Sequence, residues 1–259
     1  MSEPRATSAC TFIGTSGWSY KHWCGGIFYP EGIKTIDWLH YYSRHFNSVE
    51  INNTFYRLPA RGVFEKWHAT TPANFTFAVK ANRFITHVKR LADPEEHVAR
   101  FLENARSLGE KLHVILFQLP PYWTFDPGRL EGLFNFLSRQ QLVPGVRTAV
   151  EVRHASWYCD ACLDLLRRHH ASLVLADWPR CIVEGPDTAD FVFVRRHGPA
   201  SLYASSYSDS SLHREAQRVR TWVAEGKSVY MYFNNDANGY AVKNALRLRE
   251  ILGEGPPAV

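Results

Sequence analysis

The chain has 259 residues, of which 45% are hydrophobic and 14% aromatic, and this composition supports one well-cored domain over residues 1–259 and excludes a disordered chain. The net charge of +5 favours an anionic partner, either a phosphorylated small molecule or nucleic acid, although ordinary surface lysine and arginine would give the same excess. No apolar run approaches the ~18 residues of a membrane span, and residues 1–10 lack a signal-like apolar segment, so we expect a cytoplasmic protein with no membrane partner.

Short apolar stretches alternate along the chain with amphipathic ones. The short stretches predict eight strands, at residues 11–15, 48–52, 75–80, 112–118, 147–152, 172–176, 191–195 and 228–233. The amphipathic stretches predict helices within residues 35–46, 62–71, 93–108, 126–137, 156–169, 211–225 and 241–251.

Strands that alternate with helices predict a parallel sheet with right-handed crossovers. Eight such units in a chain of this length predict an α/β fold consisting of a single (β/α)8 TIM-type barrel. Only residues 179–190 separate the sixth strand from the seventh, so the crossover helix there is expected to be short or missing. An open doubly wound sheet is the alternative, but no Gly-x-Gly-x-x-Gly turn follows the first strand.

Every predicted strand ends in hydrogen-bonding or titratable residues, and barrels of this type carry their active sites at those ends. In strand 48–52, Val49 and Ile51 lie on one face, while Glu50 and Asn52 lie on the other, because strand side chains alternate. An inward carboxylate costs free energy unless something pairs with it. The polar residues could simply mark where strands leave the core, but that explains an inward Glu50 poorly.

The strand ends combine acid–base groups with cations. We predict Glu50, Glu151 and Asp177 as catalytic acids or bases, because neighbouring cations tune the pKa of a carboxyl group. The predicted substrate- or anion-binding residues are Trp18, Asn52, Asn53, Tyr56, Lys80, Arg83, Gln118, Arg153, His154, Arg195, His197, Asn234, Asn235 and Asp236. Alternatively, Glu50 and Glu151 only neutralise Arg153 and Lys80 in buried ion pairs.

We predict no metal and no other cofactor. The acidic and histidine residues at the strand ends could ligate an ion, but the arginines and the lysine beside them repel cations. A Schiff-base role for Lys80 is not expected, because its neighbours should pair it rather than desolvate it. Cys159 and Cys162 have the spacing of a redox or zinc motif, but no second pair exists, and we interpret them as residues at the start of a helix.

Several segments resemble the YecE-like family, catalogued as domain of unknown function 72. They are GTSGW at 14–18, VEINNTFY at 49–56, AVK at 78–80 with RFITH at 83–87, FQLPP at 117–121, EVRH at 151–154 with SW at 156–157, and YFNND at 232–236. The resemblance covers nearly the whole chain and implies a TIM-type barrel. It supplies no reaction, although a nucleic-acid or endonuclease-like role has been suggested for the family. The chain departs from the expected barrel at the short segment 179–190.

We therefore expect an enzyme of the hydrolase, isomerase or lyase type that acts by acid–base catalysis on a phosphorylated or otherwise anionic, sugar-like substrate. A nucleic-acid phosphodiesterase is the first alternative, and it would need a metal site and a basic groove past Arg83, Lys89 and Arg90. A non-catalytic binder of an anionic metabolite is the second, and in it ion pairs would fully occupy Glu50 and Glu151.

Overall fold

The computed structural model describes residues 9–140, 144–179 and 181–257, which form a mixed α/β fold with two five-stranded sheets. One sheet has the strand order β2-β3-β4-β5-β6 and the other β1-β10-β9-β7-β8. All neighbouring strands are parallel except β7 and β8, which are antiparallel. The strands are β1 (Thr11–Thr15), β2 (Ser48–Ile51), β3 (Thr76–Lys80), β4 (Leu112–Gln118), β5 (Arg147–Glu151), β6 (Ser172–Leu173), β7 (Leu175–Trp178), β8 (Cys181–Val183), β9 (Phe191–Arg196) and β10 (Ser228–Phe233).

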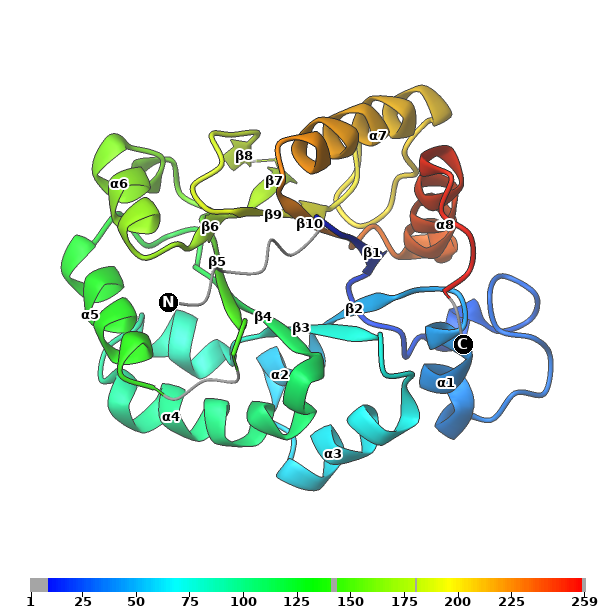
Figure 1. Cartoon of the computed structure of the whole chain (residues 1–259), viewed down its shortest axis with the longest axis horizontal. Helices are drawn as coiled ribbons and strands as arrows, with labels where there is room; N and C mark the ends of the chain where they lie inside the picture. Colours follow the sequence, from blue (N-terminus) through cyan, green and yellow to red (C-terminus); the bar gives the residue numbers. More distant parts are fainter. Residues whose placement is uncertain (1–8, 141–143, 180, 258–259) are drawn as a thin grey trace, which may run out of the picture.

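Helices surround the strands on the outside (Figure 1). A side-chain cap begins α5: Asp126 Oδ1 accepts a hydrogen bond from the Arg129 amide at 3.1 Å, and Pro127 is the first helical residue. The α-helices are α1 (Trp38–Ser43), α2 (Asn53–Tyr56), α3 (Arg61–Thr70), α4 (Pro94–Ala105), α5 (Pro127–Ser138), α6 (Asp160–Arg168), α7 (Asp209–Ala224) and α8 (Tyr240–Leu252). The 3-10 and π-helical segments are η1 (Lys21–Trp23), η2 (Thr35–Asp37), η3 (Phe84–Val88), η4 (Arg106–Lys111), η5 (Ala155–Trp157) and η6 (Ala237–Gly239). No helix of the part of the chain that the structure describes is long and apolar enough to cross a membrane.

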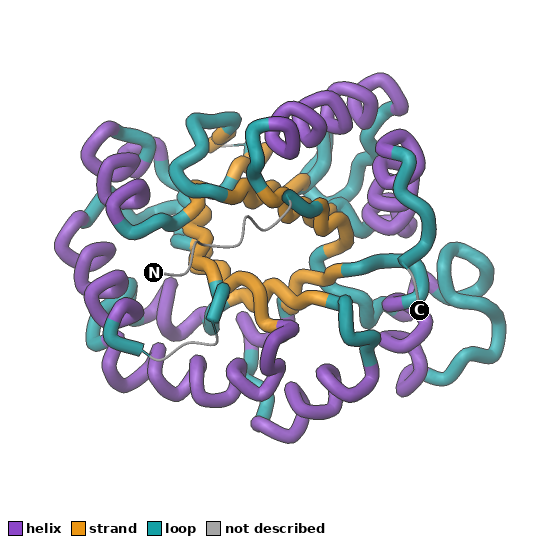
Figure 2. Tube along the Cα trace, in the orientation of Figure 1, coloured by secondary structure: helices purple, strands orange, loops and turns teal. Residues whose placement is uncertain are grey.

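The two sheets meet at two places, and together their strands run round a ring (Figure 2). At the first, Ser16 forms a parallel bridge with Glu50, and the Gly17 amide donates to the Glu50 carbonyl at 2.8 Å. At the second, Val174 separates β6 from β7, and its amide donates to the Val150 carbonyl at 2.9 Å. The chain therefore passes from one sheet into the other within a single predicted strand.

The sixth predicted strand, 172–176, is thus two short strands, β6 and β7, because the chain leaves β5 and joins β9 at Val174. Residues 179 and 181–190 contain β8 and no helix, as the short predicted crossover requires. Cys159 precedes α6 and Cys162 lies buried within it, which agrees with their interpretation as residues at the start of a helix.

Alternate residues of the strands belong to two separate apolar clusters. The smaller cluster fills the ring and consists mainly of Ala78, Val114, Leu116, Ala149, Val174, Ala176, Phe191, Phe193, Tyr230 and Tyr232. The larger cluster contains the intervening residues, such as Val79, Val150 and Val194, which pack against the helices. Because the alternation has period two, the residue two positions after each inward apolar residue also faces the inside of the ring.

Candidate functional site

The inward faces of the strands change from apolar to charged near their carboxyl ends. Lys80 follows Ala78 by two positions on β3, and Glu151 follows Ala149 on β5. Arg195 follows Phe193 in the same way on β9, and Glu50 lies on the corresponding face of β2. The packed apolar layer below therefore holds these four charged groups at one end of the ring.

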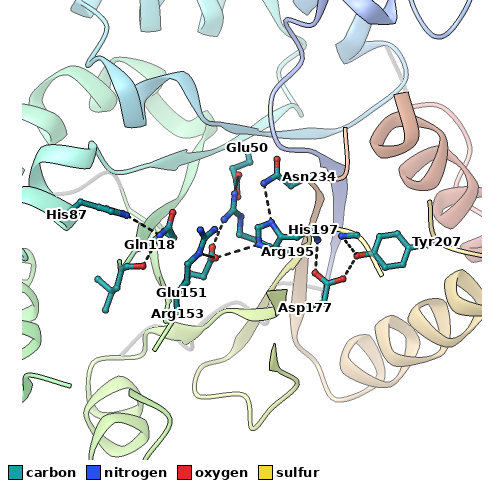
Figure 3. A network of polar contacts seen from close by, with 12 residues as sticks. Glu50, His87, Gln118, Glu151, Arg153, Asp177, Arg195, His197, Tyr207 and Asn234 are labelled. Atoms are coloured by element: carbon teal, nitrogen blue, oxygen red, sulfur yellow. Dashed lines mark hydrogen bonds and ion pairs between the residues drawn. The ribbon is translucent and has the colours of Figure 1, made fainter. Parts of the chain in front are cut away.

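Arg195 links the two glutamates in the centre of this cluster (Figure 3). Its Nη2 donates to Glu50 Oε1 at 2.8 Å, and its Nη1 donates to Glu151 Oε2. All three side chains are 0% exposed. Buried charges of this kind are tolerated only when they are paired and hydrogen-bonded, so each of the three depends on the others.

Glu151 has further partners on its other oxygen. Arg153 Nε donates to Glu151 Oε1 at 2.7 Å, and His197 Nε2 lies 3.6 Å from the same atom. Burial would raise the pKa of Glu151, but the charges of Arg153 and Arg195 outweigh burial and hold that pKa well below its usual value. Burial lowers the pKa of His197, so its imidazole is neutral at pH 7. The Arg153 guanidinium also stacks on Trp178, with its carbon 3.7 Å from the ring centroid.

Lys80 lies beside this network but is not part of it. Its side chain is 7% exposed and has no hydrogen bond or ion pair among the residues that the structure describes, while its Nζ lies 4.1 Å from the centroid of the Phe55 ring. Burial, followed by the charge of Arg195, lowers the pKa of Lys80 to about 7. The expectation that neighbouring carboxylates pair this lysine is therefore wrong: the arginines take Oε1 of Glu50 and both oxygens of Glu151, and Lys80 forms no ion pair with either glutamate among the described residues.

Replacing Lys80 by methionine is expected to raise the free energy of unfolding at pH 6 by on the order of 2 kcal/mol, because it removes a poorly paired buried ammonium. In the unfolded chain Lys80 stays protonated up to pH ~10, whereas in the folded protein it loses its proton near pH 7. The free energy of unfolding of the wild type therefore rises between pH 7 and pH ~10. The gain in the variant therefore shrinks by pH 9, and urea unfolding at both pH values measures it. Lys111→Met is the control and should destabilise, since Lys111 Nζ donates to the carbonyls of His68 at 2.6 Å and Thr71 at 2.7 Å. A less stable Lys80→Met variant would contradict the prediction.

His87 belongs to the site although it was not among the predicted site residues. A single turn of π-helix, η3, carries it, and such turns are frequent at functional sites. His87 Nε2 lies 3.4 Å from Gln118 Nε2, and its ring packs edge-on to Phe55 at 5.0 Å. Burial and the charge of Lys80 lower the pKa of His87 to about 4, so it is neutral at pH 7. The sequence signal was present in the basic loop after β3, but only the fold brings that loop over Lys80.

Asp177 supports the site from one side without joining the ion-pair network. Its Oδ1 accepts from the His197 amide at 2.6 Å, and its Oδ2 accepts from the Tyr207 hydroxyl. Asn234 Nδ2 lies 3.2 Å from Nδ1 of the His197 ring. Both residues therefore orient His197.

Three other predicted residues make local contacts instead. His154 Nδ1 accepts from the Ser156 amide at 3.2 Å, and so caps η5. Asn235 donates to the Ser205 carbonyl and to Asn244, each at 2.8 Å, which ties its loop to α8. Asp236 accepts from Trp23 Nε1 at 2.7 Å and pairs with His22 at 2.9 Å, and burial raises its pKa to about 6.

A pocket of about 230 Å³ lies next to the end of β2. Asn52 Oδ1 in its wall is buried and has no hydrogen-bond partner in the part of the chain that is described. Tyr56, which also lines the pocket, is 82% exposed. The pocket is lined by Gly17, Trp18, Ser19, Tyr20, Asn52, Asn53 and Tyr56.

Arg83 is exposed on the loop after β3 and contributes to the charge around His87. Within residues 9–140, 144–179 and 181–257, no group of three or more histidine, cysteine, aspartate or glutamate side chains could hold a metal ion. The acidic and histidine residues that could have ligated a metal are engaged elsewhere. Asp177 accepts from the His197 amide, His154 accepts from the Ser156 amide, and arginines pair with Glu151.

The sequence matches a known protein family. The model described as "Protein of unknown function DUF72" matches residues 12–258. The UPF0759 protein YecE of Escherichia coli K12 is 33% identical over 57% of this chain and 50% of YecE, so the match spans about half the length of that relative. The UPF0759 protein YunF of Bacillus subtilis 168 is 26% identical over 93% of this chain and 94% of YunF.

Solved structures agree with the family match. A DUF72 family protein from Thermotoga maritima is 30% identical, with a TM-score of 0.83 over 95% of this chain and 100% of that one. Another, from Enterococcus faecalis, is 22% identical, with a TM-score of 0.80 over 96% and 99% of the two chains. The crystal structure of SacUVDE, 8% identical with a TM-score of 0.56 over 95% and 98%, shares the fold alone. With a family model that matches nearly its whole length, this chain belongs to the DUF72 family.

Proposed function

We propose that the protein is an enzyme that binds a small anionic, sugar-like substrate where β2, β3, β5 and β9 end. The observation that carries the proposal is the buried network of Glu50, Arg195, Glu151 and Arg153 with Lys80 unpaired at its edge. When Lys80 is protonated, the site has three cations, Arg153, Arg195 and Lys80, and two carboxylates, Glu50 and Glu151. The surplus positive charge favours an anion such as a phosphate or carboxylate group.

The residues of the site divide into three roles in this proposal. Arg153 and Lys80, at the edge of the network, bind the anion, and the pocket beside Asn52 and Trp18 takes the sugar-like part. Glu151, with both oxygens engaged by arginines, orients Arg153. Proton transfer falls to Lys80 and to Glu50, whose Oε2 has no hydrogen-bond partner among the described residues.

We also propose that the ring of strands is a closed (β/α)8 barrel of the TIM type, in which β6 and β7 together act as the sixth strand. The Ser16–Glu50 bridge and the passage of the chain through Val174 support closure. In such a barrel the polar strand ends lie at the mouth, where substrates bind.

Isothermal titration calorimetry with ribose 5-phosphate and with ribose tests the anion-binding part of the proposal. The wild-type protein is expected to bind the phosphorylated sugar more tightly by about tenfold or more, since a charge-assisted hydrogen bond contributes roughly 1.5–3 kcal/mol. Arg153→Gln should remove most of that preference. Arg167→Gln is the matched control, because Arg167 lies exposed on α6 in an ion pair with Asp164.

Equal affinity for ribose and ribose 5-phosphate, or an Arg153→Gln variant with unchanged preference, would overturn the proposal. A DNA duplex in the same calorimeter distinguishes the nucleic-acid alternative. Tight binding that weakens steeply with salt, together with no sugar-phosphate binding, would favour that alternative. The binder alternative requires fully occupied carboxylates, which Oε2 of Glu50 does not fit.

A further inference from the structure

We propose that the Lys80 amine is a covalent nucleophile that forms an imine with an aldehyde or ketone, so that the substrates are carbonyl-bearing sugar phosphates in their open-chain form. This inference rests on the proposed function, because Arg153 would bind the phosphate group of that substrate while the Lys80 amine reacts with its carbonyl group. It adds the class of reacting group and the atom that attacks it.

The first argument is the contrast between two buried lysines. Lys111 Nζ donates to the carbonyls of His68 and Thr71 and lies 3.2 Å from Thr71 Oγ1, as expected of a lysine with a structural role. Lys80 is also buried, but its Nζ has no hydrogen bond or ion pair among the described residues and lies 4.1 Å from the centroid of the Phe55 ring. The Phe55 ring gives a buried ammonium a cation–π contact but no hydrogen bond, so desolvation still costs the charged amine more than the neutral one.

The second argument is the position of the amine. Lys80 is the last residue of β3, and Thr54 Oγ1 donates to its carbonyl at 2.6 Å. Asn82 Nδ2 in turn donates to the Thr54 carbonyl at 2.9 Å, which holds the strand end and α2 together. The amine therefore extends from a rigid element and keeps 7% of the side chain exposed, as a preorganised nucleophile requires.

The third argument is the protonation state, because only the neutral amine attacks a carbonyl. The groups that act on Lys80 are Arg195 and Arg153, which disfavour its charge, and Glu151 and Glu50, which favour it. Burial exceeds them all and lowers the pKa of Lys80 to about 7. Roughly half of the molecules then carry a neutral amine at pH 7, against roughly one in three thousand for an ordinary lysine.

The step needs no reactant other than the carbonyl compound and one proton from solvent. The nitrogen lone pair forms a bond to the carbonyl carbon, and the carbonyl electrons move to oxygen, which takes a proton from the amine. The hydroxyl of this neutral carbinolamine then takes the proton from solvent and leaves as water, while the nitrogen lone pair forms the C=N bond of a protonated imine. Glu50 and Glu151 lie in the same cluster to balance its positive charge, while Arg153 remains available to the phosphate.

Reductive trapping tests the inference. The intact protein is incubated with one equivalent of dihydroxyacetone phosphate or of dihydroxyacetone, each with sodium cyanoborohydride, and peptide mass spectrometry locates the adduct. Lys80 should be labelled at least about tenfold more than any other lysine, Lys111 included, and its labelling should rise with pH through about 7. Lys80→Arg and Lys80→Met should lose the adduct while remaining folded.

The results separate this inference from the proposed function. Adducts spread evenly over the lysines, or unchanged labelling in Lys80→Met, would overturn the inference. If ribose 5-phosphate binds in the calorimeter but Lys80 is never trapped, the imine is wrong and anion binding stands. If Lys80 is trapped equally by the phosphorylated and the unphosphorylated ketone, the nucleophile stands and the anion site is wrong.

Discussion

Replacing Arg195 by methionine is expected to lower the free energy of unfolding by about 3–5 kcal/mol. The change leaves Glu50 and Glu151 buried at 0% exposure with their shared partner gone. Removal of one member of a buried ion-pair network is far more costly than loss of a surface pair, because the remaining charges stay desolvated. Urea unfolding at pH 7 measures the loss, which is a large share of the ~5–15 kcal/mol of a typical domain.

Two controls show whether the cost comes from the stranded carboxylates. Arg247→Met removes an exposed arginine that pairs with Asp209 at 2.6 Å, and it should change the free energy of unfolding far less than Arg195→Met does. In wild type, arginines depress the pKa of Glu151, so its contribution to stability is present above pH 4.5 and falls away below it. In Arg195→Met the Glu151 carboxyl group should take up a proton at higher pH, and the difference in stability from wild type should therefore narrow from pH 7 to pH 5. A variant as stable as wild type at pH 7 would show that the network does not form as described.

Replacing Gly14 by alanine is expected to cost about 3 kcal/mol or to prevent folding, because β1 approaches β2 too closely for a side chain. A Cβ at Gly14 would lie 2.2 Å from the Ser48 carbonyl oxygen and 2.8 Å from the Tyr42 hydroxyl. That hydroxyl lies 3.0 Å from both the Thr15 amide and Thr15 Oγ1 and donates to the Ser48 carbonyl at 3.2 Å, so it joins the two strands where the sheets meet. The backbone oxygen cannot move without opening this junction. Thermal unfolding and urea unfolding both report the loss.

Gly132→Ala is the matched control for Gly14. Gly132 lies within α5, and a Cβ there would meet nothing within 4 Å. Alanine should raise stability by roughly 0.5–1 kcal/mol, because glycine is the poorer helix former. An equal change in the free energy of unfolding of the two variants would show that the close approach of β1 to Ser48 is not a constraint on the fold.

The alternation of strands and helices along the chain and the face of β2 that carries Glu50 could be predicted from local pattern alone. Alternation in β2 put Glu50 on the face opposite Val49 and Ile51, and the larger apolar cluster contains those two residues without Glu50. The short segment after the sixth strand also predicted the missing crossover helix. The division of that strand at Val174 could not be predicted, because it depends on which neighbours, β5 or β9, each half pairs with.

For a related reason, the sequence could not predict which charged residues of the site form ion pairs with each other. Glu50 pairs with Arg195, which lies 145 residues away along the chain, and not with Lys80 on the adjacent strand. Which cation reaches a carboxylate depends on side-chain length and direction across the ring. Local pattern likewise could not show that His154 and Asn235 make contacts outside the central network.

The sequence by itself determined the family, the alternation of strands and helices, and the set of polar residues at the strand ends, because each follows from local periodicity and motif. Only the tertiary structure decided that the arginines occupy the carboxylates and that Lys80 is left against Phe55 with a pKa of about 7. The physical reason is that burial and ion pairing depend on groups far apart in the chain, and the fold alone sets their distances.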